Sequence, residues 1–94
     1  MGTDLKYMLE IEAEGFDMDD DYYDLIVKCG GVSVEKSKAD VTVEGGDHFL
    51  TIDTSGFPNG VLQLVTIAHV PDSVFPDAER TEVEVLNLCE LRRI

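Results

Sequence analysis

The sequence predicts an all-β domain, an antiparallel sandwich of two sheets built from about seven short strands. Apolar and polar side chains alternate in several short runs, as they do in strands with one buried face. Gly-Gly, Pro and Asn-Gly turn signals separate these runs. No segment keeps helical periodicity over three turns. We expect one immunoglobulin-like domain over residues 1–94, with a small barrel as the alternative.

Alternation in the first third of the chain predicts a strand, an acidic loop and a hairpin. Apolar residues at every second position from Leu5 to Ala13 predict the first strand. Residues 14–21 form a loop, and residues 23–29 are the second strand. Gly30-Gly31 permits the positive φ angles of a tight hairpin, so the return strand begins at Val32.

The next segment predicts a second hairpin and a turn. Residues 37–40 are a polar connection, and a short strand follows at 41–43. Gly45-Gly46 is the second two-glycine turn, from which residues 49–54 return. Residues 55–60 carry the turn signals Pro58 and Asn59-Gly60.

Residues 61–70 and 81–91 are the last two predicted strands. The first has apolar residues on both faces, which indicates a central strand covered on both sides or one that packs against a partner. In the second, apolar positions move from odd (Val83, Val85) to even (Leu86, Leu88). This shift predicts a bulge or burial on both faces.

The net charge of −13 limits the classes of partner. Nucleic-acid and anionic-membrane binding need clustered Lys and Arg, and the sequence has no such stripe. The charge is typical of a soluble surface, with a basic partner or a bound cation as alternatives. No secretion signal or membrane span is evident, so we expect a cytoplasmic protein.

The residues needed for catalysis or zinc binding do not form a recognisable pattern. Cys29, Cys89, His48 and His69 are too far apart in sequence to form a zinc-ligand pair. No serine lies in a nucleophile elbow, and neither glycine pair has the lysine of a phosphate loop. We therefore predict no enzyme and no cofactor. The cysteines are expected to be buried free thiols, with an inter-sheet disulfide as the alternative.

The acidic loop is the first candidate site. Asp17, Asp19 and Asp21 are spaced like the first ligands of an EF-hand, but Tyr22 and Lys28 replace its required Gly and Glu. A solvated loop is one interpretation. The alternative is a cation- or ligand-binding module, with carbohydrate as a further ligand class. Its looser Ca²⁺ site would use these residues: Asp17, Asp19, Asp20, Asp21 and Asp24.

The loop after residue 70 is the second candidate site. Two X-Pro steps keep its backbone extended, and two apolar residues lie between them. Either Phe75 folds back to plug the end of the sandwich, or it anchors a protein partner. The interaction candidates are Pro71, Asp72, Val74, Phe75, Pro76 and Asp77.

One stretch of the chain has a recognisable pattern, residues 60–77 together with residues 80–83. It contains the run Pro71-Asp72-Ser73-Val74-Phe75-Pro76-Asp77 and then Arg80-Thr81-Glu82-Val83. This pattern resembles short proteins encoded in prophage-like regions of gut anaerobes. Those proteins in turn resemble the immunoglobulin-like N-terminal module of phage baseplate and tail proteins, which has Gly where Ala78 stands here. The resemblance covers roughly residues 50–91, and residues 22–36 more diffusely. It implies a non-catalytic assembly module that contacts another protein or itself, in the cytoplasm before assembly or in a phage-like particle.

Overall fold

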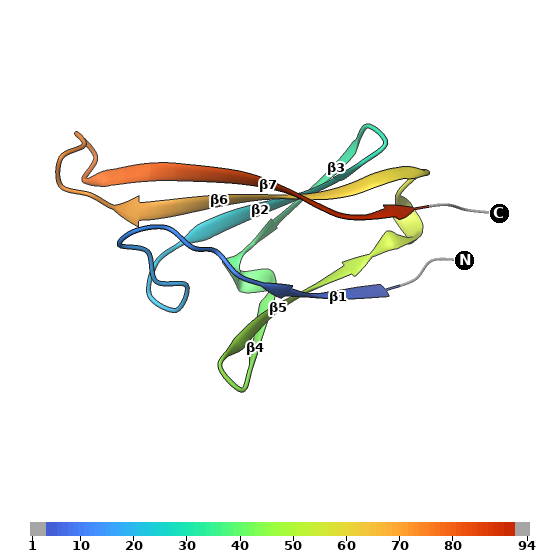
Figure 1. The fold of residues 1–94 in the computed structure, drawn as a ribbon, viewed down its shortest axis with the longest axis horizontal. Coiled ribbons are helices and arrows are strands. Elements are labelled where there is room, and N and C mark those ends of the chain that lie inside the picture. Colours follow the sequence, from blue (N-terminus) through green and yellow to red (C-terminus); the bar gives the residue numbers. More distant parts are fainter. Residues whose placement is uncertain (1–3, 92–94) are drawn as a thin grey trace.

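The computed structural model describes residues 4–91, which form two antiparallel sheets packed face to face (Figure 1). The three-stranded sheet has the order β1 (Asp4–Leu9), β5 (Asp47–Asp53) and β4 (Val41–Glu44). The four-stranded sheet has the order β3 (Val32–Ser37), β2 (Tyr23–Cys29), β6 (Gly60–Pro71) and β7 (Glu79–Leu91). Two short 3₁₀ turns, η1 (Lys38–Asp40) and η2 (Thr54–Gly56), complete the elements. The predicted β-sandwich is confirmed.

Strand alternation places the core between the sheets. In β2 every second residue from Tyr23 is buried, and β6 shows the same pattern from Leu62. Leu50 and Ile52 of β5 join the same buried cluster from the opposite sheet. Each such side chain contributes roughly 1.5–3 kcal/mol when it leaves water. The period-2 pattern of the sequence is therefore sufficient to define the inner face of each sheet.

Both glycine pairs form the predicted hairpin turns. The φ angles are +56° and +86° at Gly30 and Gly31, and +58° and +87° at Gly45 and Gly46. Two successive positive φ angles are typical of a type I′ turn, whose twist matches that of the flanking strands. The turns therefore set the register of β2 with β3 and of β4 with β5.

The first strand is shorter than the sequence predicts. β1 ends at Leu9, whose partner is His48 near the start of β5. Residues 10–13 lie beyond the reach of that partner strand and are not paired. Ile11 and Ala13 are still half-buried and Glu12 is exposed, so the alternation of burial continues without a strand.

The β6–β7 hairpin contains a bulge, but at Leu88 and not where the apolar positions change from Val85 to Leu86. Val83 and Val85 are exposed, so the alternative of burial on both faces is wrong. Leu62 pairs with Cys89, but the next residue, Gln63, pairs with Asn87. The register shift leaves Leu88 as an extra residue in β7, and both Leu86 and Leu88 pack against the core. On the outer face of β6, Val61 is exposed and Ile67 is half-exposed, so no second layer of the described residues covers this face.

Cys29 and Cys89 are not bonded to each other. They lie on β2 and β7 of the same sheet with β6 between them, so an inter-sheet disulfide is excluded. Cys29 is buried, and its thiol donates to the Pro58 carbonyl at 3.3 Å. Cys89 is exposed, so the expectation of a buried free thiol is right for Cys29 and wrong for Cys89.

Candidate functional site

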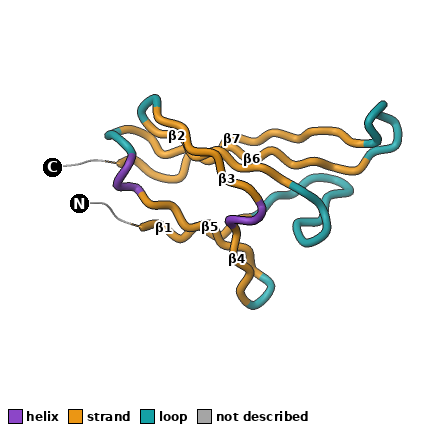
Figure 2. The backbone as a smooth tube through the Cα atoms, turned by 180° about the vertical axis from the view of Figure 1, so that it is seen from behind, coloured by secondary structure: helices purple, strands orange, loops and turns teal. Residues whose placement is uncertain are grey.

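The two candidate loops lie at the same end of the molecule. In Figure 1 the loop between β1 and β2 and the turn between β6 and β7 are both on the left, and Figure 2 shows the same proximity from behind. The Arg80 guanidinium connects them, because it donates to the Glu14 carbonyl and, at 3.1 Å, to the Asp72 carboxylate. We call this region the loop end. The start of β1 and the end of β7 lie at the opposite end (Figure 1).

The turn between β6 and β7 is held by its own hydrogen bonds. The backbone amide of Asp72 donates to the Ala78 carbonyl at 2.9 Å, and the Ala78 amide donates to the Phe75 carbonyl at 2.9 Å. The Asp72 carboxylate accepts from the Val74 amide at 3.1 Å and also pairs with Arg80. Asp72 is thus engaged inside the turn and braces its backbone.

The apolar residues of this turn face solvent. Val74 is 87% exposed and Phe75 is 47% exposed, and neither belongs to the buried core. Pro71, Pro76 and Asp77 are also exposed. Phe75 therefore does not plug the sandwich, and that interpretation is wrong. The long hairpin carries the aromatic ring beyond the reach of the core.

The carboxylates of the acidic loop mostly stabilise the loop itself. Asp17 accepts from the Asp19 amide and Asp21 accepts from the Asp17 amide, both at 2.8 Å. The Asp19 carboxylate also lies 3.0 Å from Nε2 of His48. Lys38 donates to the backbone carbonyls of Asp19 and Asp21, each at 2.8 Å. The turn is therefore tied to η1 by Lys38 and to β5 by His48.

Asp24, the fifth residue of the predicted Ca²⁺ set, takes part in a different cluster. It lies on the outer face of β2, where its carboxylate is 3.0 Å from Nε2 of His69. Asp20 is exposed on the loop. Within residues 4–91, no three His, Cys, Asp or Glu side chains are arranged to hold a metal ion. Four of the five aspartates thus lie in one loop. The fifth, Asp24, lies on β2 and is engaged by His69 instead.

His69 is the centre of a cluster that sequence reasoning missed. Its Nδ1 lies 2.8 Å from the Glu79 carboxylate, and its ring is 5.6 Å from that of Tyr22. The hydrogen bond to Asp24 raises the pKa of His69 above its ordinary value, burial opposes this, and Glu79 adds to the increase. Because both ring nitrogens are engaged by carboxylates, His69 links β2, β6 and β7. It has no free nitrogen to act as a general base.

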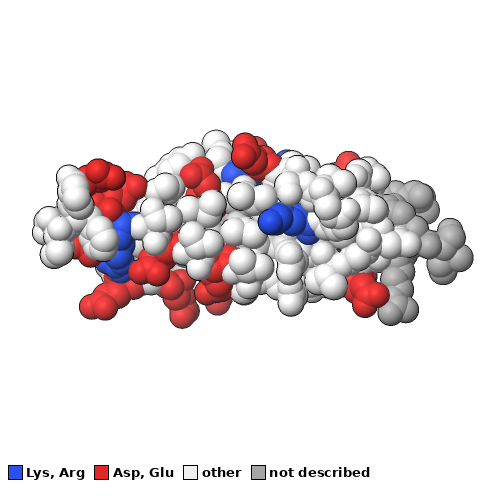
Figure 3. Space-filling model, turned by 90° about the horizontal axis from the view of Figure 1, so that it is seen from above, with Lys and Arg blue, Asp and Glu red and all other residues white. Residues whose placement is uncertain are grey.

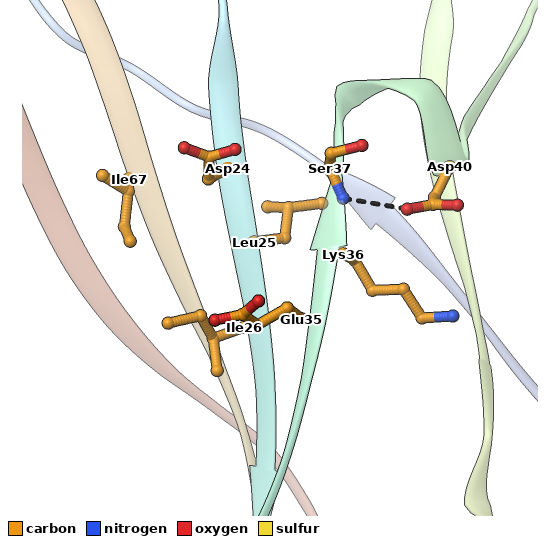
Figure 4. A pocket seen from close by; sticks show the side chains of 8 residues that line it. All are labelled: Asp24, Leu25, Ile26, Glu35, Lys36, Ser37, Asp40 and Ile67. Carbon is orange, nitrogen blue, oxygen red and sulfur yellow. Dashed lines mark hydrogen bonds between the residues drawn. The ribbon is translucent and has the colours of Figure 1, made fainter.

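A shallow groove of about 390 Å³ lies beside this cluster along β2 and β3 (Figure 4). Asp24, Ile26 and Ile67 line it from β2 and β6, and the Ser37 amide donates to Asp40 at its far side. The Lys36 side chain extends away from Asp24 in Figure 4. The lining combines acidic and aliphatic side chains with Lys36 and Ser37, and it contains neither a cysteine nor a histidine.

No protein-family model, curated protein or solved structure matches the chain. Among the described residues there is no helix of the length and hydropathy needed to cross a bilayer. The geometry of the loop end is therefore the basis for a functional proposal.

Proposed function

We propose that this domain is a non-catalytic structural module that assembles by protein–protein contact through the tip of the β6–β7 hairpin. The observation that carries the proposal is the exposure of Val74 and Phe75 on a turn held by its own hydrogen bonds. Aromatic residues, Phe among them, are enriched at protein interfaces, and buried aromatic anchors carry much of the binding energy. A turn that is already ordered loses little conformational entropy on binding, which favours its use as a contact.

The proposal extends to an immunoglobulin-like fold, which the order of the strands supports. In immunoglobulin variable domains one sheet contains strands C′, C, F and G, and the other contains B, E and D. The orders β3-β2-β6-β7 and β1-β5-β4 correspond to these when β1 is equated with strand B. In that correspondence the acidic loop is the B–C loop and the tip is the F–G loop, which lie at one end in such domains.

The particle to which the module belongs is proposed from the resemblance alone. Residues 60–77 and 80–83 resemble phage baseplate and tail modules, so a phage or prophage-derived tail or baseplate is the proposed assembly. Ala78 has φ +57°, at the position where those modules have Gly. Gly is the preferred residue at a position with positive φ, so the local geometry is compatible with the resemblance.

The test compares tagged chains that carry Phe75→Ala or Val74→Ser with the unaltered chain. Each is used to capture partners from cells that encode the protein, and the partners are identified by mass spectrometry. We expect tail or baseplate proteins with the unaltered chain and their loss with both variants. Val43→Ser is the matched control, since Val43 of β4 is 56% exposed on the other sheet. It should retain the partners.

Stability separates a contact role from a packing role in the same variants. Because Phe75 is half-exposed and outside the core, Phe75→Ala should change the free energy of unfolding by less than about 1 kcal/mol. A large loss of stability with unchanged capture would contradict the proposal and make Phe75 a packing residue. Capture of the same particle proteins by all variants would also contradict it.

A further inference from the structure

The outer face of the four-stranded sheet carries an aliphatic row that becomes more exposed toward β7. Ile26 pairs with Val65, and Val65 pairs with Val85, so the three side chains share one face across three strands. Ile67 and Val83 form the adjacent pair. Val65 is 9% exposed, but Val85 is 56% and Val83 is 61% exposed. Figure 3 looks onto this face, where a mostly uncharged band crosses the middle and acidic side chains gather at its margins.

The row ends at an open sheet edge. β7 is the last strand of its sheet, and its far side has no strand partner among residues 4–91. From Glu79 to Leu86 it has no proline and its register with β6 is regular, since the bulge lies beyond at residue 88. Proteins usually block such an edge with proline, a bulge, inward-pointing charges or a covering segment. Of these devices, residues 80–86 carry charges on the inner face, Glu82 and Glu84. The backbone groups of this edge are open to an added strand only if its side chains complement these charges.

Charge selects which strand fits this edge. Glu82 and Glu84 alternate with Val83 and Val85 along β7 and lie on the opposite face. Glu82 pairs with Arg80, whereas Glu84 has no ion-pair partner in the described part of the chain. A second copy of the chain would oppose these glutamates with its own and would add a net charge of −13. Like charges directly opposite each other destabilise strand pairing, so self-association at this edge is disfavoured.

We propose that residues 80–86 of β7 accept an extended segment of a partner protein in which Lys or Arg alternates with Val or Ile. The aliphatic residues would continue the row formed by Ile26, Val65 and Val85. The basic residues would face Glu82 and Glu84. This inference rests on the proposed protein-contact function, but it assigns the contact to a different surface from the hairpin tip.

The probe is a short synthetic peptide of strictly alternating Lys and Val, added to the isotope-labelled full chain. Binding is followed by NMR, with hydrogen exchange of each backbone amide as the second readout. We expect chemical-shift changes and exchange protection centred on residues 80–86 of β7. Two control peptides have the same composition, one with its lysines and valines in separate blocks and one with alternate amides N-methylated. Both should bind at least about tenfold more weakly. The block peptide cannot place its valines and lysines on opposite faces of a strand, and the methylated peptide lacks amide donors for the ladder.

Protein variants test the side-chain contacts. The double variant Val83→Thr, Val85→Thr keeps β-branched side chains, so the strand should persist. It should weaken peptide binding about fivefold to tenfold through loss of two cross-strand aliphatic pairs. Val43→Thr removes a valine of equal exposure from the other sheet and should have no effect. Glu84→Gln should weaken binding and reduce its dependence on salt.

The proposal is overturned if the block peptide binds as tightly as the alternating one, because net charge alone then explains the attraction. It is also overturned if binding gives no exchange protection in β7, or if no binding occurs. Phe75→Ala should leave peptide binding unchanged, so the two surfaces are tested separately. Failure at the β7 edge with Phe75-dependent capture intact would remove this inference and leave the proposed function standing.

Discussion

At the scale of single residues, His69 connects β2, β6 and β7. Asp24 and Glu79 engage its two ring nitrogens, and Asp24 is the larger cause of its raised pKa. A histidine whose pKa is raised by folding binds its proton more tightly in the native state. Its contribution to stability is fully present below the ordinary pKa of 6.5 and is lost as pH rises through the folded pKa.

Replacing His69 should therefore have a pH-dependent cost. His69→Gln should lower the free energy of unfolding more at about pH 5 than at about pH 9, because only the imidazolium is favoured by both carboxylates. Urea denaturation at the two pH values measures this difference. Asp24→Asn should lower the pKa of His69 in an NMR titration. An equal loss at both pH values would show that His69 stabilises the sheet only by packing.

Ala78 carries local backbone strain. Its φ of +57° is the only positive value at a non-glycine residue among residues 4–91, and Ala in that region costs roughly 1–2 kcal/mol. Ala78→Gly should raise the free energy of unfolding by about 0.5–1 kcal/mol, after the greater freedom of Gly in the unfolded chain is subtracted. Urea denaturation of the variant and the unaltered chain measures this change in the free energy of unfolding. A destabilised variant would mean that the Ala78 side chain makes a contact that outweighs the strain.

At the scale of elements, the two glycine hairpins differ only in their surroundings. A Cβ atom on Gly30 would lie 2.5 Å from Cγ of Pro58, because this turn packs against the segment that leads into β6. A Cβ atom on Gly45 would meet nothing within 4 Å. Their φ angles are +56° and +58°, so the backbone strain of an alanine is the same at both positions.

The variants Gly30→Ala and Gly45→Ala form a matched pair, in which the loss of stability can be compared at equal backbone strain. Gly45→Ala should cost about 1–2 kcal/mol from backbone strain alone. Gly30→Ala should cost at least about 1 kcal/mol more, since overpacking adds to the same strain. Thermal and urea unfolding of the two variants measure the difference. Equal losses would mean that Pro58 moves aside freely and that the hairpin is not held against the β6 turn.

At the scale of the whole molecule, the charge of −13 opposes the compact state. Monovalent salt should raise the melting temperature by screening this repulsion. Ca²⁺ and Mg²⁺, compared with each other at equal ionic strength, should shift the melting temperature equally. The carboxylates of Asp17 and Asp21 already accept hydrogen bonds from backbone amides. A clearly larger shift with millimolar Ca²⁺ would instead support a cation site in the acidic loop, because binding to the native state must stabilise it.

The sequence by itself determined the features that depend on neighbours along the chain. Alternating side chains predict the strands because successive residues of a strand point to opposite faces. Glycine pairs predict the hairpins because their φ angles are a local property. The shift from Val85 to Leu86 is a change from the outer to the inner face within a regular strand, and the bulge comes later, at Leu88. The candidate tip around Phe75 was also predicted from sequence, because apolar residues between prolines stand out in a loop.

Only the tertiary structure decided which distant residues meet. The bonds of His69 to Asp24 and of Arg80 to Glu14 join residues that are far apart in the chain. They depend on the order and register of the strands, because a one-residue slip of register would move each side chain to the opposite face. The exposure of Phe75, the open edge of β7 and the placement of both cysteines in one sheet have the same origin. Periodicity predicts which residues share a face of a strand, but not which strand or solvent lies beyond that face.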